Sequence, residues 1–281
     1  MKRALLLFLV LTFGVAAKTP FNTKTVGRKN YAAILAAKAF AWLAANQDEK
    51  TFGIDVVLLY TFTMHKFNSP DLSITHLVRE KARRGYYSSK EGSPFLHVIS
   101  PLEGTPLQVS ERINIDAMTS TALWCDRKQP FDGYLDKLRS MGRMGKYELT
   151  HMYWAILMMK EKECAFFQGN QSALEALEKE FVRDLHALVA RGAVDDLTIE
   201  ATTFLYYGSA ATKATEDYLI GILPAMERAF DNAKTTRLSA HTVALFYWGL
   251  LEYLNPDLPR VPLAVRFRVG MGTVRHDNRK I

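Results

Sequence analysis

The sequence predicts an all-helical protein built largely from antiparallel helix pairs. From residue 113 onward, apolar residues recur with the spacing of one helix face, and short polar or glycine-containing breaks separate the apolar stretches. Breaks of this length force neighbouring helices to run antiparallel. A hydrophobic fraction of 48% is ample for one large core.

The same spacing predicts where each helix lies. Upstream, we expect helices over residues 28–46, 54–67 and 70–84, the last with Ser69 as its cap and Pro70 in its first turn. Downstream, we expect helices over residues 113–126, 130–142, 147–164, 170–191, 195–210, 214–231 and 238–255.

A weak internal repeat relates the more apolar helices. Their leading apolar residues are separated by 41, 36, 48 and 41 residues, and are Leu72, Ile113, Leu149, Leu197 and Leu238. Such spacing is typical of two-helix units. Nearly uncharged helices alternate with charged ones such as 170–191, which predicts an inner and an outer layer. The arrangement resembles an α/α toroid or a curved helical-hairpin solenoid.

Residues 85–112 interrupt this pattern. Glycines and prolines punctuate two short extended runs, 95–99 and 107–109, so we expect an irregular or β-hairpin insertion. A connection of this length is more often functional than idle. The alternatives are a helix without a clear stripe or a disordered excursion.

The first 17 residues have the pattern of a secretory signal peptide. Met1, Lys2 and Arg3 precede an apolar run of twelve residues, and small residues follow up to Ala17. A bilayer-spanning helix needs about 20 apolar residues. We therefore expect residues 1–17 to be cleaved and the chain to be exported, to a periplasm or the extracellular medium, with no transmembrane segment afterwards. The alternative is an uncleaved short anchor.

The formal charge of +7 is distributed unevenly. The signal segment carries two of these charges and the tail 260–281 carries a net five, so the intervening residues are neutral overall. A neutral body together with export argues against a nucleic-acid partner. We expect one helical domain over residues 18–259, followed by a basic, partly extended tail that is solvated, packed or in contact with an anionic surface.

Two cysteines are present, Cys125 and Cys164. The expected helices place both at the C-terminal ends of inner helices, near enough for a bond in an oxidising compartment. One disulfide and two buried thiols are both compatible with the sequence.

The familiar catalytic motifs are missing. The chain contains no His-Glu-x-x-His, Cys-x-x-Cys, Gly-x-Ser-x-Gly or phosphate-binding glycine-rich loop. The toroid architecture is similar to that of terpene cyclases, protein prenyltransferases, glycoside hydrolases and polysaccharide lyases. The resemblance spans roughly residues 70–255 and implies no residue assignment, because their Asp-x-Asp-Asp and Gln-Trp motifs are also missing.

One polar constellation follows from the repeat. Aligned inner helices place Asp116, His151, Glu200 and His241 near their N-terminal ends. Parallel inner helices would gather these side chains at one end, as an acid/base set or around a divalent metal. Their spacing matches no recognised metal motif, so we assign no metal ligands and no cofactor. The alternative is ordinary carboxylate placement at helix starts.

Four aromatic residues lie on the same inner helices: Trp124, Trp154, Tyr207 and Trp248. They are candidates for stacking on a sugar or peptide ligand. Aromatics at helical spacing also serve as plain core residues.

No motif specifies a reaction, and whether the chain is an enzyme stays open at this point. The first hypothesis is an exported protein whose concave surface binds a peptide, glycan or protein partner. The second is an α/α-toroid hydrolase or lyase that acts on a glycan or cell-wall substrate through the polar constellation.

Overall fold

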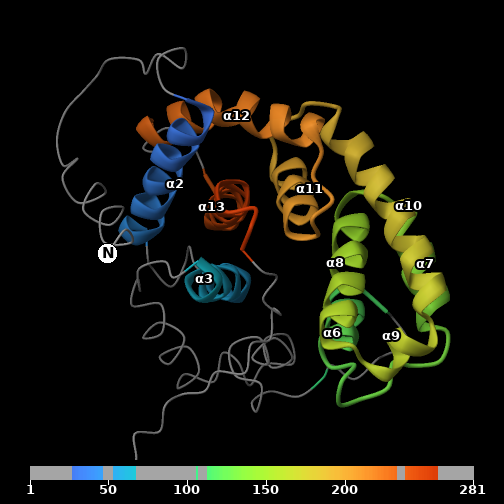
Figure 1. The fold of residues 1–281 in the computed structure, drawn as a ribbon. Coiled ribbons are helices and arrows are strands. Elements are labelled where there is room, and N and C mark those ends of the chain that lie inside the picture. Colours follow the sequence, from blue (N-terminus) through green and yellow to red (C-terminus); the bar gives the residue numbers. More distant parts are fainter. Residues whose placement is uncertain (1–26, 47–52, 68–105, 107–112, 233–237, 259–281) are drawn as a thin grey trace, which may run out of the picture.

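A computed structural model describes residues 27–46, 53–67, 106, 113–232 and 238–258 (Figure 1). Ten helices occupy these ranges, and no strand occurs within them. The prediction of an all-helical protein is confirmed. The expected helix 70–84, the signal segment, the tail and, apart from Pro106, the insertion 85–112 with its β-hairpin lie outside the described residues.

The helices, in chain order, are α2 (Arg28–Ala45), α3 (Ile54–Phe67), α6 (Ile115–Leu123), α7 (Tyr134–Gly142), α8 (Lys146–Lys162), α9 (Ala165–Gly169), α10 (Gln171–Val189), α11 (Asp196–Tyr207), α12 (Lys213–Asp231) and α13 (Ala240–Leu254). Most bounds agree with the expected ones to within a few residues. The short helix α9 was not expected, because five residues are too few to show a helical stripe.

The helices form two layers (Figure 1). The inner row runs in space from α6 through α8, α11 and α13 to α3, each packed on the next. The outer helices α7, α10, α12 and α2 cover this row: α7 and α10 pack on α8, α10 and α12 on α11, and α2 on α13. Almost all large, fully buried side chains lie between or within these layers.

The first described helix pair lies beside the last one. Helix α2 packs on α12 and α13, and α3 packs on α13 (Figure 1). Lys38 Nζ is 2.8 Å from Glu227 Oε1, and the Tyr31 hydroxyl donates a hydrogen bond of 2.7 Å to the same carboxylate. These contacts join segments almost 200 residues apart in the chain.

Side-chain caps fix the starts of three inner helices. Asn114, Asp195 and Ser239 accept hydrogen bonds from the third backbone N–H beyond themselves, at the starts of α6, α11 and α13. Each bond satisfies a donor that the first helical turn leaves unpaired. Helix α8 starts differently, after Gly145 at φ +76°, a conformation that favours glycine.

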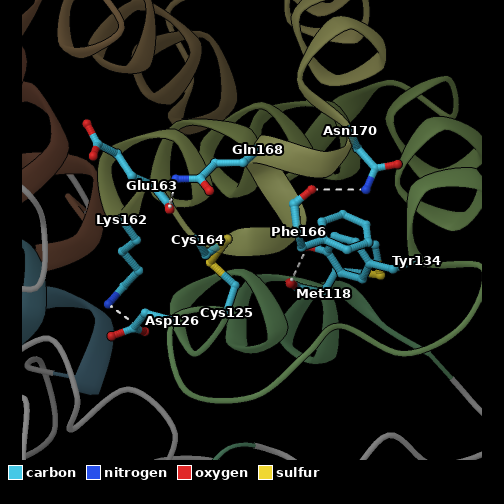
Figure 2. The surroundings of a disulfide bond; sticks show 10 residues. All are labelled: Met118, Cys125, Asp126, Tyr134, Lys162, Glu163, Cys164, Phe166, Gln168 and Asn170. Atoms are coloured by element: carbon cyan, nitrogen blue, oxygen red, sulfur yellow. Dashed lines mark hydrogen bonds and ion pairs between the residues drawn. A yellow bond between two sulfur atoms is a disulfide. The ribbon is translucent and has the colours of Figure 1, made fainter.

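A disulfide joins Cys125, just after α6, to Cys164, just before α9 (Figure 2). The two Cα atoms are 5.7 Å apart, and both residues are buried. Nearby, Lys162 Nζ is 3.1 Å from Asp126 Oδ1, and the Tyr134 hydroxyl donates to the Met118 carbonyl at 2.9 Å. The bond therefore ties together the C-terminal ends of α6 and α8.

No helix within the described ranges combines the length and the apolar character needed to cross a lipid bilayer.

Removing the disulfide should lower stability substantially. The bond closes a loop with a sequence separation of 39, for which the loss of unfolded-state entropy corresponds to about 4 kcal/mol. We expect a Cys125→Ala/Cys164→Ala variant to lose about this much free energy of unfolding in urea titrations. Wild-type protein under reducing conditions should lose a similar amount. A change below about 1 kcal/mol in both would contradict the expectation.

Gly142 at the end of α7 is a packing constraint. A Cβ at this position would overlap the ring of Phe181, which is fully buried. We expect Gly142→Ala to lower the free energy of unfolding by about 1–3 kcal/mol through overpacking. Gly221, exposed within α12 with open space around it, is the matched control, and Gly221→Ala should raise stability by about 0.5–1 kcal/mol. Equal effects of the two substitutions would rule out the packing argument.

Candidate functional site

The N-terminal ends of three inner helices meet at Asp196, the first residue of α11. Asp196 Oδ1 accepts hydrogen bonds from His241 Nδ1 at 3.2 Å and from the Thr242 hydroxyl at 2.6 Å, both on α13. The Tyr147 hydroxyl of α8 donates to Oδ2 at 2.9 Å. Because each donor lies in the first turn of its helix, α8, α11 and α13 point the same way here.

Glu200 lies one turn further along α11 and is only 1% exposed. Its Oε1 atom is 3.3 Å from His151 Nδ1, but no donor in the described part of the chain is aligned to make a hydrogen bond to that oxygen. Asp196, Glu200 and His241 each place one potential metal-binding atom here, and these three atoms lie within 4.8 Å of one another. Asp55, at the start of α3, adds a carboxylate oxygen 3.8 Å from His241 Nε2. We call Asp196, Glu200, His241 and His151 the N-terminal cluster.

The surroundings of His151 fix the position of its proton. Nδ1 is 2.9 Å from the backbone carbonyl oxygen of Tyr147, and a carbonyl oxygen only accepts hydrogen bonds. In the neutral ring Nδ1 must therefore carry the hydrogen, which leaves the lone pair on Nε2. A quarter of the His151 side chain is exposed, and its neutral ring has a lone pair at Nε2.

The two carboxyl groups of the cluster have opposite pKa shifts. Burial raises the pKa of Glu200. It outweighs the charge of His151 and hydrogen bonding by Thr150, which both act to lower that pKa. Burial also acts to raise the pKa of Asp196, but hydrogen bonds from His241, Thr242 and Tyr147 more than offset it and lower that pKa to about 2. The environments thus favour an ionised Asp196 and disfavour charge on Glu200.

His241 is held close to negative charge. Burial by itself would lower its pKa, but the hydrogen bond to Asp196 and the charges of Asp196, Asp55 and Glu200 raise the pKa above its usual value. The cluster therefore attracts positive charge, whether a proton or a cation.

The structure brings together three of the four residues expected from the repeat. His151, Glu200 and His241 belong to the cluster, but Asp116 does not. Asp116 is exposed at the start of α6, and α6 packs on α8, the helix that lies between it and α11 (Figure 1). Its inclusion was wrong, because α6 lies one position too far along the inner row.

Sequence reasoning missed Asp196, which stands next to Asp195 at the start of α11. The cap is Asp195 alone, so a second adjacent acid had no capping role to fill. The i, i+4 spacing of Asp196 and Glu200 also places both on one face of α11. Asp55, Tyr147 and Thr242 carried no comparable signal.

Three of the four candidate stacking residues belong to the hydrophobic core. Trp124, Tyr207 and Trp248 are 5%, 1% and 0% exposed, because they face neighbouring inner helices. In the described part of the chain they present no open ring face, so their interpretation as ligand-stacking residues is corrected to core packing.

Trp154 is different, because it is partly exposed. Its ring stacks on Phe204 with centroids 5.4 Å apart and lies 6.2 Å from the His151 ring. On the other side of His151, the Tyr147 ring is 6.5 Å away and the residue is 38% exposed. Tyr147, His151 and Trp154 thus form a row along one face of α8, beside the N-terminal cluster.

A second buried polar group lies at the opposite, C-terminal ends of the inner helices. Lys66 Nζ contacts both oxygens of Glu252 at 2.7 and 2.8 Å, and Trp248 Nε1 donates to Glu252 Oε1 at 2.8 Å. Lys66 also lies 5.3 Å from the centre of the Tyr207 ring. Because opposite charges pair fully here, the group is explained by stability alone.

A hollow of about 370 Å³ also lies at that end, beside the disulfide, and its lining includes Asp126, Arg127, Lys128 and Lys162. Lys162 is already paired with Asp126 (Figure 2). The hollow is remote from the N-terminal cluster, since it adjoins the opposite end of α8.

Comparison with protein-family models, with curated proteins and with solved structures finds no match for this chain.

Breaking the buried pair at the C-terminal ends should be costly. Lys66→Met leaves the Glu252 carboxylate buried without its cation, and we expect a loss of about 3–5 kcal/mol in the free energy of unfolding. The matched control is Lys66→Met/Glu252→Gln, which removes both charges and keeps an acceptor for Trp248. Thermal and urea unfolding should show most of the loss restored in the double variant. A double variant as unstable as the single one would contradict the charge-pair explanation.

Proposed function

We propose that the chain is an exported enzyme of α/α-toroid type, a hydrolase or lyase acting on a glycan or cell-wall polymer. The observation that carries the proposal is the convergence of two carboxylates and two histidines from three inner helices. Capping uses a single side chain at each helix start, which is Asn114 at α6, Asp195 at α11 and Ser239 at α13. A shared cluster across three helices is more than capping requires.

His151 is the proposed proton acceptor. In hydrolysis a base takes a proton from the attacking water, and in elimination by a lyase it takes a proton from the carbon next to a carboxylate. In both reactions the glycosidic C–O bond breaks and the leaving oxygen takes up a proton from the solvent. Nε2 of His151 has the free lone pair for either step, while the Tyr147 carbonyl holds the ring in place. Asp196 likewise holds the His241 ring in place, by accepting a hydrogen bond from its Nδ1.

The aromatic row on α8 favours a sugar substrate. Sugar rings stack on the faces of partly exposed aromatic side chains, and Tyr147 and Trp154 flank His151 at ring distances of 6.5 and 6.2 Å. A sugar resting on this row would bring its ring atoms close to the proposed acceptor. This placement supports a glycan over a peptide.

Two further features support the proposal. The α2–α3 pair packs beside α12 and α13, so the inner row has α3 at one end and α6 at the other, as a ring with one missing unit would. For export, the signal pattern of residues 1–17 agrees with a disulfide, which persists in oxidising compartments.

His151→Ala should abolish most of the activity. The mature protein would be screened on peptidoglycan and on neutral and acidic polysaccharides, with new reducing ends indicating hydrolysis and unsaturated ends indicating elimination. On any substrate cleaved, we expect kcat to fall by about 10²–10⁴-fold in His151→Ala, the contribution of a general base. The control is Asp116→Asn, which should keep wild-type kcat because Asp116 is exposed and outside the cluster.

Two results would overturn the proposal. One is unchanged kcat in a folded His151→Ala variant. The other is binding of a polysaccharide without cleavage of any, which would favour the alternative of a concave binding surface for a glycan, peptide or protein partner.

A further inference from the structure

The N-terminal cluster contains one atom whose environment is incomplete. Glu200 is 1% exposed, and within the described residues Oε1 has no hydrogen bond and forms its ion pair with a histidine rather than a lysine or arginine. Buried carboxylates in proteins are hydrogen-bonded, paired with a cation or bound to a metal. Glu252, the other buried carboxylate in the described part of the chain, meets this rule through Lys66.

We infer that Asp196, Glu200 and His241 are the protein ligands of a divalent metal ion of the zinc type. The inference deepens the proposed function by naming a cofactor for its site, and it rests on that function only for the metal's role, not for binding. Three protein ligands are the usual number in catalytic zinc sites, where a fourth position stays open for water or substrate.

The geometry is compatible with such an ion. In a tetrahedral zinc site with bonds of about 2.1 Å, the ligand atoms lie about 3.4 Å from one another. The three ligand atoms lie within 4.8 Å of one another, so side-chain rotations that close the set by up to about 1.4 Å bring them to bonding distance of one ion. Asp196 and Glu200 come from one face of α11 at i, i+4 spacing, and His241 comes from α13.

The surrounding groups would orient two of the ligands. If His241 binds through Nδ1, which already faces Asp196, its Nε2–H points toward Asp55 Oδ2, 3.8 Å away. A carboxylate behind the second ring nitrogen is the common support for a metal-binding histidine. Hydroxyls of Thr242 and Tyr147 hold the Asp196 carboxylate.

The ligand types select among metals. A mixed set of one imidazole and two carboxylates suits Zn²⁺ or Mn²⁺, whereas Ca²⁺ and Mg²⁺ prefer oxygen ligands alone. A bound ion would place a positive charge beside Glu200 Oε1 and satisfy the buried oxygen. An ion with an open position would also polarise a water or a substrate carboxylate near His151.

Metal titration of the untagged mature chain tests the inference. After treatment with a chelator and its removal, isothermal titration calorimetry would follow addition of ZnCl₂, with MnCl₂, MgCl₂ and CaCl₂ in parallel. We expect one Zn²⁺ per chain and a higher thermal unfolding temperature. Glu200→Gln and His241→Ala should each weaken Zn²⁺ binding by at least about 100-fold, since each removes a ligand where loss of a supporting group alone costs 10- to 100-fold.

Controls for unfolding, for nonspecific carboxylate binding and for support of a ligand complete the experiment. Glu200→Gln is isosteric and removes a buried ionisable group, so the metal-free variant should unfold at a temperature no lower than metal-free wild type. Asp116→Asn alters another carboxylate at an inner-helix start and should bind Zn²⁺ like wild type. Thr242→Val keeps all three ligands, and its affinity should fall by about 10- to 100-fold.

The inference is overturned if wild type binds none of the four cations stoichiometrically, or if Glu200→Gln binds Zn²⁺ as tightly as wild type. Its failure can be distinguished from failure of the proposed function. Stoichiometric Zn²⁺ binding without cleavage of any polysaccharide would retain the site and refute the enzyme. Cleavage that persists in the chelator-treated protein would retain the enzyme and refute the metal's role in cleavage.

Discussion

The apolar inner helices admit charge only at their two ends, and this constraint organises the structure. Helices α8, α11 and α13 pack side by side, and a buried ion between their middles would cost several kcal/mol. The two buried carboxylates of the described residues accordingly lie near opposite ends, Glu200 in the second turn of α11 and Glu252 in the last turn of α13. At the C-terminal end a lysine compensates the charge. At the N-terminal end no lysine or arginine does so within the described chain, which makes that end the place where a ligand has most to contribute.

Adjacent residues at the start of α11 divide two tasks. Asp195 satisfies the backbone of the first turn, so the side chain of Asp196 is free to reach α13 and α8. Caps also fix the starts of α6 and α13. The first turns of α11 and α13 are therefore held by their own backbone hydrogen bonds, and Asp196 joins them to each other and to α8.

Periodicity and breaks in the sequence were sufficient to predict nine of the ten described helices and to place His151, Glu200 and His241 at one end. Position along a helix follows from counting residues, but the direction in which a side chain points and the helix it meets depend on packing. Asp116 therefore failed, since α8 separates its helix from α11. Trp124, Tyr207 and Trp248 failed for the same reason, because an uncharged inner helix buries several faces at once. The five-residue helix α9 and the contact of Asp55 with His241 left no periodic signal.

The residue at position 200 bears most directly on whether the cluster is functional. Replacing buried polar groups by apolar ones of similar size is often neutral or stabilising, so stability alone does not require a carboxyl group there. Glu200 instead keeps a carboxyl group out of water, and one of its oxygens receives no hydrogen bond from the residues that the structure describes. Exceptions to good local packing in natural proteins concentrate at functional sites, and this one adjoins an oriented imidazole and a row of partly exposed aromatic rings. A structural role does not explain these three features together, whereas a binding or reaction centre does.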